Sequence, residues 1–128
     1  MMKGISILGS TGSIGQNTLR VVEHLGNIRV VAMAAGRNMS TFADQIAKFK
    51  PDLVSCDDEA CAEVLERELA ARGAAVPQIE LNEKGLVAVA THDEAETVVS
   101  ATVGAVGFVP TLRAIEAGKR IALANKET

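Results

Sequence analysis

The sequence contains no tryptophan or tyrosine and only three phenylalanines among its 128 residues, although 48% of the residues are hydrophobic. A core must therefore be built from alanine, valine, isoleucine and leucine, which is typical of a parallel sheet covered by helices. A chain of this length is the size of one ordinary domain.

Positive charge is not in excess either, because 13 lysines and arginines stand against 16 aspartates and glutamates, for a net charge of −3. Without a basic surface, we expect no binding of nucleic acid and none of an anionic membrane. No run approaches the roughly 20 apolar residues that span a bilayer, and no signal or transit peptide is recognisable. We therefore expect a cytoplasmic protein whose partner is a small molecule.

Cysteine and histidine are scarce. Cys56 and Cys61 are separated by an acidic stretch without CxxC spacing or a nearby histidine, and we interpret them as reduced, inert thiols. A metal pair and redox chemistry are the less favoured alternatives. His24 and His92 have no partner in the sequence, and we expect structural or solvated roles for them.

Short apolar runs alternate with segments of helical periodicity. Strands are predicted at residues 4–8, 28–35, 53–56, 97–100 and 120–124, and helices at 14–25, 41–50, 59–71 and 110–117; a strand within 76–81 and a short helix at 85–90 are less clear. Ser40 is predicted to cap the second helix and Pro51 to end it. The alternation indicates an α/β fold, a doubly wound and mainly parallel sheet with helices on both faces (Rossmann-like).

The first predicted strand leads into a loop in which glycines recur every third residue, at Gly9, Gly12 and Gly15. In a strand–turn–helix context, such glycines allow a tight turn, an approaching pyrophosphate and close packing of the helix on the sheet. A P-loop is excluded because no G-K-[ST] follows. The alternative is a Gly/Ser-rich turn without a ligand.

Several groups of this loop could bind a phosphate. The backbone amides of residues 11–14 are predicted to point at the anion, and the helix dipole adds partial positive charge there. The hydroxyl groups of Ser10, Thr11 and Ser13 could donate further hydrogen bonds.

The second predicted strand ends in Gly36, Arg37 and Asn38, and no acidic residue lies between positions 28 and 40. An NAD site usually carries an acidic residue here, whereas Arg37 can pair with a 2′-phosphate, with Asn38 donating beside it. These residues predict NADP(H). The alternative is that Arg37 is a solvated loop cation.

Two further segments could belong to a site. The small residues 101–107 would either let a nicotinamide or ribose approach the backbone or serve helix–sheet packing. Asn125, Lys126 and Glu127 follow the last predicted strand, as a frayed tail or as part of a site for a phosphorylated or carbonyl substrate. No crossover follows that strand, so we expect that the chain is a fragment.

Taken together, residues 9–15, 35–38 and 123–127 resemble the amino-terminal domain of the 1-deoxy-D-xylulose 5-phosphate reductoisomerases, in the order and spacing of that family. The resemblance implies that residues 1–128 are an NADPH-binding domain. The residues implied are Thr11, Gly12, Ser13 and Ile14 for NADPH, Gly36, Arg37 and Asn38 around its adenosine phosphate, Asn125 and Glu127 also for the cofactor, and Lys126 for the substrate.

The resemblance also implies an activity. Such enzymes rearrange 1-deoxy-D-xylulose 5-phosphate and reduce the product with NADPH to 2-C-methyl-D-erythritol 4-phosphate, in the non-mevalonate pathway of isoprene biosynthesis. They use Mg²⁺ or Mn²⁺ as a Lewis acid and form homodimers. The metal ligands lie beyond the part of the family represented here, so we expect this chain alone to be inactive.

Two rival interpretations stay open at this point. One is another NADP-dependent dehydrogenase domain, such as that of an aspartate-semialdehyde dehydrogenase, which would need a nucleophilic cysteine after the last strand. The chain has none there. The other is a regulatory NADP-sensing module without catalysis.

Overall fold

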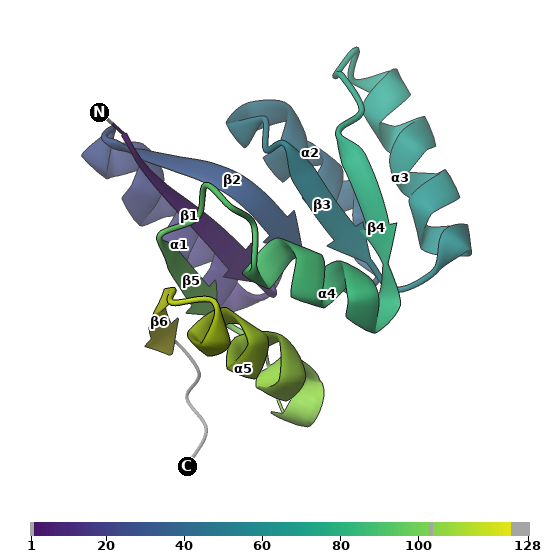
Figure 1. The fold of residues 1–128 in the computed structure, drawn as a ribbon. Coiled ribbons are helices and arrows are strands. Elements are labelled where there is room, and N and C mark those ends of the chain that lie inside the picture. Colours follow the sequence, from purple (N-terminus) through teal and green to yellow (C-terminus); the bar gives the residue numbers. More distant parts are fainter. Residues whose placement is uncertain (1, 103, 124–128) are drawn as a thin grey trace.

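Strands and helices alternate along the chain, as the hydrophobic pattern predicts (Figure 1). The structure is a computed structural model, which describes residues 2–102 and 104–123. Its elements are β1 (Lys3–Leu8), α1 (Ser13–Leu25), β2 (Ile28–Ala34), α2 (Met39–Phe49), β3 (Leu53–Cys56), α3 (Glu59–Ala71), β4 (Gln78–Leu81), α4 (Asn82–Ala90), β5 (Thr97–Ser100), a 3₁₀ turn (Gly104–Gly107), α5 (Phe108–Glu116) and β6 (Arg120–Leu123).

The strands form one sheet in the order β4-β3-β2-β1-β5-β6, and every neighbouring pair is parallel. At the carboxyl end of β1, Leu8 is aligned with Ala34 of β2 and with Ser100 of β5. The strand order reverses direction between β1 and β5, and ligands of open α/β sheets bind at such a switch point. The predicted doubly wound, Rossmann-like class is confirmed.

Two apolar layers hold the helices on the sheet. On one face, α1, α2 and α3 bury side chains such as Leu19, Phe42 and Leu65 against β1, β2 and β3. On the other face, α4 and α5 bury Val89 and Ala114 against the remaining strand side chains. Figure 1 shows α4 and α5 together on the side of the sheet opposite α2. The sheet is thus covered on both faces, which explains the nearly continuous apolar runs of its strands.

The start of α2 differs from the sequence prediction. The cap is Asn38 and not Ser40, because the Asn38 side chain accepts a hydrogen bond from the Thr41 amide and the helix already begins at Met39. Met39 is buried in the same layer as Phe42, so an earlier start brings an additional apolar side chain into the core. The prediction of Ser40 as the cap was therefore wrong.

The starts of two further helices differ from the sequence prediction. The uncertain region contains β4 at Gln78–Leu81, followed directly by α4, which begins at Asn82 rather than at 85. The helix α5 begins at Phe108, so that Pro110 lies in its first turn, where a proline costs no helical hydrogen bond. Position 124, predicted to end the last strand, lies outside the described residues.

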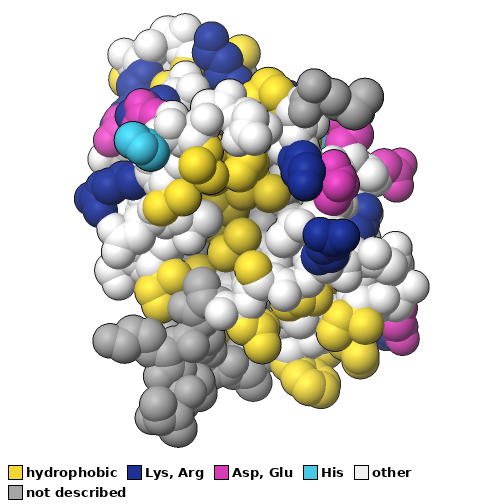
Figure 2. Space-filling view, turned by 90° about the vertical axis from the view of Figure 1, so that its left-hand side faces the viewer, with side chains coloured by type: hydrophobic (Ala, Val, Ile, Leu, Met, Phe, Trp, Pro, Cys, Tyr) yellow, Lys and Arg dark blue, Asp and Glu magenta, His cyan; other side chains and the backbone are white. Residues whose placement is uncertain are grey.

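None of the helices in the described ranges is both long enough and apolar enough to cross a membrane. Apolar side chains are nevertheless exposed on the side of the molecule that carries α1 and β6, where Figure 2 shows them gathered with charged groups at the margin. On α5 and β6 the exposed residues are Phe108, Leu112, Ile115 and Leu123.

Candidate functional site

The loop after β1 is closely packed against the ends of its neighbouring strands. Gly9 has a positive φ of 85°, and a Cβ on it would lie 2.8 Å from the carbonyl oxygen of Ala101. The amides of Gly9 and Ser10 both donate to the carbonyl of Ala34, at 2.8 and 3.0 Å. Because a Cβ on Gly15 would overlap the Gly9 carbonyl, the first turn of α1 lies directly on this loop. The predicted roles of Gly9 and Gly15 are both visible in the geometry.

The amino end of α1 is the part of this loop that is open to an anion. Its cap, Gly12, has no side chain and makes no capping hydrogen bond, whereas α2 and α3 are capped by Asn38 and Asp58. Within the described part of the chain, the amides of Ser13 and Ile14 find no protein acceptor. A Cβ on Gly12 would meet only the Gly9 carbonyl at 3.8 Å, so space remains in front of these amides. Uncapped amides and the dipole of a 13-residue helix favour a phosphate at this position.

Ser10 does not take the role predicted for it. Its side chain is fully buried, and its hydroxyl donates to the Gln45 Oε1 at 2.8 Å, while the Gln45 Nε2 donates to the Ser10 carbonyl at 2.8 Å. The prediction that this hydroxyl faces a phosphate was wrong, since the hydroxyl instead ties the loop to α2. Sequence reasoning missed Gln45, although a polar residue on the apolar face of a helix is a signal that a buried group needs a partner.

Arg37 lies beyond the end of β2, exposed, with an ion pair that the sequence did not suggest. Its Nη1 lies 3.4 Å from an oxygen of Asp57 and 3.3 Å from an oxygen of Asp58, both of which follow β3. Hydrogen bonds from Cys61, and then the charge of Arg37, lower the pKa of Asp58. Acidic residues are therefore present beside Arg37 after all. The sequence contained a signal for this contact, because Asp57 and Asp58 follow the third predicted strand and Arg37 follows the second. The carboxyl ends of adjacent parallel strands meet at one edge of the sheet.

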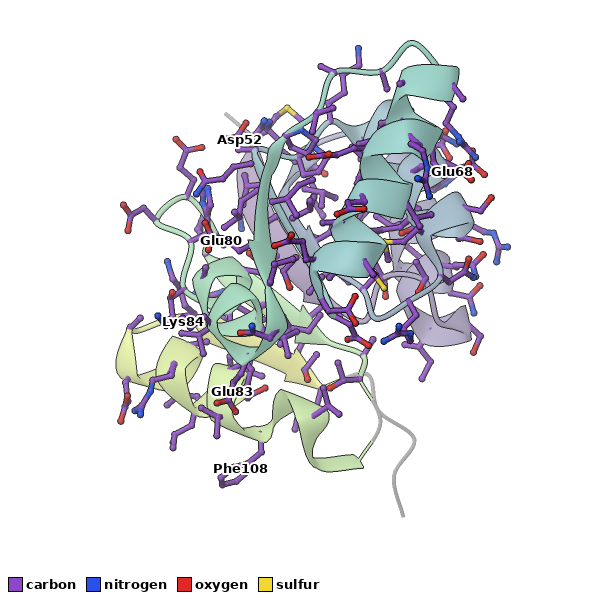
Figure 3. The ribbon with its side chains drawn as sticks, turned by 90° about the vertical axis from the view of Figure 1, so that its right-hand side faces the viewer. Asp52, Glu68, Glu80, Glu83, Lys84 and Phe108 are labelled. Atoms are coloured by element: carbon purple, nitrogen blue, oxygen red, sulfur yellow. The ribbon has the colours of Figure 1, made fainter. Side chains whose placement is uncertain are left out.

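A cavity of about 340 Å³ lies at this edge of the sheet. It is bordered by the loops after β1, β2 and β3, by the start of α4, and by the segment after β5. Its lining residues are Gly9, Ala34, Ala35, Gly36, Ser55, Cys56, Asp57, Asn82, Glu83, Leu86, Thr102 and Val106. Figure 3 places Glu83 at the start of α4. The glycine loop and Gly36, which are distant in sequence, thus border one crevice at the switch point.

In the segment after β5, the structure shows helix–sheet packing, while the approach of a nicotinamide or ribose stays a prediction. A Cβ on Gly107 would overlap the Thr102 side chain, so this glycine serves packing. Thr102 and Val106, however, line the crevice. Position 103 is not described, and neither are Asn125, Lys126 and Glu127, which lie outside the described residues.

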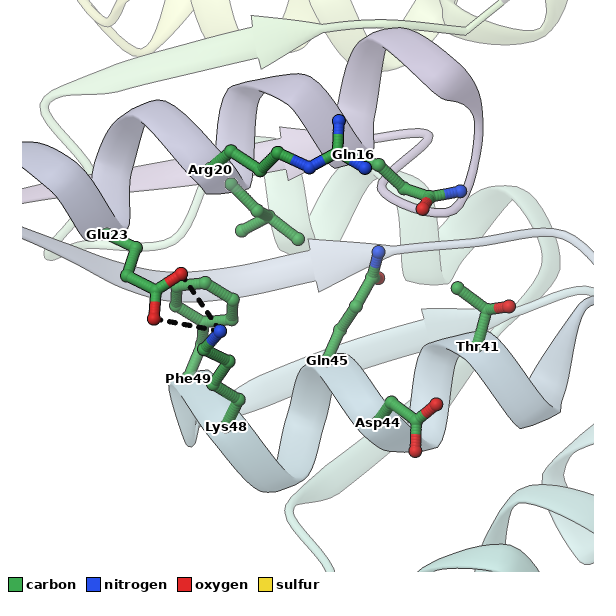
Figure 4. A pocket seen from close by; sticks show the side chains of 9 residues that line it. Gln16, Arg20, Glu23, Thr41, Asp44, Gln45, Lys48 and Phe49 are labelled. Atoms are coloured by element: carbon green, nitrogen blue, oxygen red, sulfur yellow. Dashed lines mark hydrogen bonds and ion pairs between the residues drawn. The ribbon is translucent and has the colours of Figure 1, made fainter.

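Another hollow, of about 320 Å³, lies between α1 and α2 (Figure 4). Four charged side chains line it, and three of them have charged partners: Lys48 pairs with Glu23 at 2.8 Å, and Asp44 pairs with Arg72 at 2.7 Å. Such exposed pairs contribute little to stability. Arg20, whose Nη1 donates to Asn17, is the lining charge that has no ion pair among the described residues. The crevice at the strand ends is the stronger candidate, because it lies at the switch point of the sheet.

The two cysteines are free, as predicted, and both are buried. Burial raises the pKa of the Cys56 thiol to about 11, which keeps it protonated and unreactive. Among residues 2–102 and 104–123, no group of three or more His, Cys, Asp or Glu side chains is placed to hold a metal ion. The described part of the chain thus offers a helix end that is open to an anion, and no metal cluster.

Comparison with known proteins gives a consistent result. The sequence model of the family described as 1-deoxy-D-xylulose 5-phosphate reductoisomerase matches residues 5–128. The protein of that name from Symbiobacterium thermophilum is 52% identical over 130 residues, covering 100% of this chain and 34% of the relative. The chloroplastic protein of that name from Mentha piperita is 51% identical over 127 residues, covering 98% and 27%. The chain therefore spans about a third or less of the length of these relatives.

Solved structures show the same likeness. A 1-deoxy-D-xylulose 5-phosphate reductoisomerase from Zymomonas mobilis in complex with NADPH superimposes with a TM-score of 0.87 at 33% identity, covering 98% of this chain and 32% of that one. A DOX-P reductoisomerase in complex with magnesium gives 0.89 at 34% identity, covering 99% and 32%.

Proposed function

Because the chain belongs to the 1-deoxy-D-xylulose 5-phosphate reductoisomerase family, we propose that residues 1–128 form the NADPH-binding domain of such an enzyme. The observation that carries this proposal is the uncapped amino end of α1, which lies at the switch point of the sheet and on the same edge as Arg37. The NADPH complex of the similar Zymomonas mobilis structure supports the choice of cofactor.

The proposed cofactor contacts follow from this geometry. Thr11, Gly12, Ser13 and Ile14 surround the pyrophosphate, and the amides of Ser13 and Ile14 bind it, because α1 leaves these first-turn donors open. The Gly12 amide donates to the Gly9 carbonyl at 3.4 Å, so Gly12 contributes space. Gly36 leaves room beside the adenosine ribose, and Arg37 pairs with its 2′-phosphate. The Asn38 side chain uses its oxygen to cap α2, so its amide nitrogen is the group that donates to the phosphate. Asn125 and Glu127 as cofactor contacts and Lys126 as a substrate contact stay predictions.

For the whole enzyme, we propose the NADPH-dependent conversion of 1-deoxy-D-xylulose 5-phosphate to 2-C-methyl-D-erythritol 4-phosphate. When bound, NADPH would supply the hydride, and this chain would orient it by holding the central pyrophosphate and the 2′-phosphate of the adenosine ribose. Magnesium is named for a similar structure, but the described residues contain no cluster that fits it, so we assign no metal step to them. We expect no turnover by this chain alone.

A homodimer and a cytoplasmic location are the remaining parts of the proposal. Location varies within the family, since the relatives from Mentha piperita and Oryza sativa are named chloroplastic. Sedimentation of the enzyme and fractionation of its cells test the two statements.

Calorimetric titration of this chain with NADPH and with NADH tests the proposed cofactor site. We expect tighter binding of NADPH, and Arg37→Ala should remove a preference of roughly 1.5–3 kcal/mol, as expected for a charge-assisted contact. Arg20→Ala is the matched control, because Arg20 is also exposed but belongs to α1 and lies in the other hollow. Equal binding of both nucleotides by the unchanged chain, or an equal effect of the two substitutions, would contradict the proposal.

A further inference from the structure

Asp57 occupies an unusual position relative to the end of β2. Its amide donates to the Gly36 carbonyl at 3.2 Å, and its two carboxylate oxygens lie 3.8 and 4.0 Å from the point where a Cβ on Gly36 would stand. In NAD-binding sheets of this class, the acidic residue that accepts from the ribose follows the second strand. Here that position is a glycine, and the neighbouring strand β3 supplies a carboxylate to nearly the same place.

The adjacent Asp58 differs from Asp57 in what surrounds it. Asp57 lines the crevice together with Gly9 and Gly36, whereas Asp58 is absent from the lining residues. One Asp58 oxygen accepts from the Cys61 amide at 2.9 Å and caps α3. The two carboxylates contact Arg37 at almost equal distances, so they affect its side chain alike, but only Asp57 reaches the nucleotide crevice.

The two carboxylates contact only one nitrogen of the Arg37 guanidinium. Both carboxylates contact its Nη1, and within the described ranges no hydrogen bond reaches its Nη2 or Nε. The remaining edge of the guanidinium can therefore bind a phosphate in bidentate geometry. A 2′-phosphate bound there would lie close to the Asp57 carboxylate, which repels it. A 2′-hydroxyl in the same place would instead donate to that carboxylate.

We propose that Asp57 is a second specificity-determining residue of the nucleotide site, opposing Arg37. Its carboxylate accepts a hydrogen bond from the ribose 2′-hydroxyl of NADH and disfavours the 2′-phosphate of NADPH. Arg37 and Asp57 together set the ratio of the two affinities. This inference rests on the proposed function, because it concerns the same nucleotide site.

Titration of the chain with NADH and with NADPH, followed by amide NMR shifts so that weak binding is measurable, tests the inference in Asp57→Asn. We expect NADH to bind about fivefold more weakly, since the charge-assisted hydrogen bond is lost. NADPH should bind about twofold more tightly, since a screened repulsion is removed. The matched control is Asp58→Asn, which also removes one of the two carboxylates beside Arg37 and keeps a capping side chain on α3. It should leave the NADH affinity unchanged.

The titrations distinguish a failure of the inference from a failure of the proposed function. If Asp57→Asn and Asp58→Asn shift both affinities equally, the carboxylates act only through Arg37 and the inference is overturned. It is also overturned if Asp57→Asn binds NADH as the unchanged chain does. In both cases the proposed function stands, provided that NADPH binds. If the unchanged chain binds neither nucleotide, the proposed function fails together with the inference.

Discussion

At the scale of single residues, the glycines of the loop between β1 and α1 are not equivalent. Gly15 is buried against the loop, where a Cβ would also lie 2.7 Å from backbone atoms of Ser10. Gly12 is exposed, has an ordinary φ of −73° and faces open space. An added methyl group therefore acts on the fold at Gly15 and on a ligand at Gly12.

We predict that Gly12→Ala and Gly15→Ala separate stability from binding. Gly15→Ala should lower the free energy of unfolding by about 2 kcal/mol, because the overlap is with backbone that cannot turn away. Gly12→Ala should leave that free energy within about 0.5 kcal/mol and weaken NADPH binding at least about tenfold, because the methyl group blocks the pyrophosphate. Urea unfolding and NADPH titration measure the two effects. Unimpaired binding by Gly12→Ala would contradict the phosphate site.

At the scale of elements, the amino ends of three neighbouring strands are tied together opposite the site. Asp52, just before β3, pairs with Arg29 of β2 at 2.9 Å. Its amide donates to the Val31 carbonyl at 2.9 Å, and its carbonyl accepts from Gln78 of β4 at 3.3 Å. One residue thus links β2, β3 and β4.

This link predicts a pH dependence of stability. The hydrogen bond from Arg29 lowers the pKa of Asp52 in the folded state, below the unfolded value of about 3.9. Asp52 therefore stabilises the fold above about pH 4, and the contribution is lost as the pH falls through its folded pKa. The difference in urea midpoint between the unchanged chain and Asp52→Asn should be largest at pH 7 and should shrink below pH 4. In an Arg29→Ala background the same difference should be small at every pH; a persistent difference would exclude Arg29 as the cause.

At the scale of the whole molecule, an apolar surface is exposed on one side of the sheet. Phe108 and Ile115 of α5 are 68% and 55% exposed, and Leu123 of the edge strand β6 is 74% exposed. Figure 3 shows Phe108 pointing away from the sheet. Phe108 and Ile115 are seven residues apart and share one face of α5. A large exposed apolar patch is typical of a surface that another protein covers.

We predict that the isolated chain self-associates through this surface. Light scattering should give a mass that rises with protein concentration, and the double substitution Phe108→Ser and Ile115→Ser should reduce the rise. Val76→Ser is the matched control, because Val76 is 50% exposed but precedes β4 at the other edge of the sheet. A monomeric mass at all concentrations would exclude self-association.

The sequence by itself determined the class of the fold and the position of the glycine loop between β1 and α1. Both depend on local order: the apolar period distinguishes strand from helix within a few residues, and the spacing of Gly9, Gly12 and Gly15 has meaning wherever a strand turns into a helix. Asn38 and Ser40 could both cap α2, and the pattern of neighbouring residues does not show which of them does. The burial of Met39 in the core decides between them.

Only the tertiary structure decided which partner each polar group of the site has. Ser10 and Gln45 are 35 residues apart, and Arg37 and Asp57 are 20 apart, so no local pattern pairs them. Their contacts follow from the strand order, which sets β3 beside β2, and from the packing of α2 against the sheet. The physical reason is that burial and strand pairing are properties of the whole chain, whereas turn and helix signals are properties of short segments.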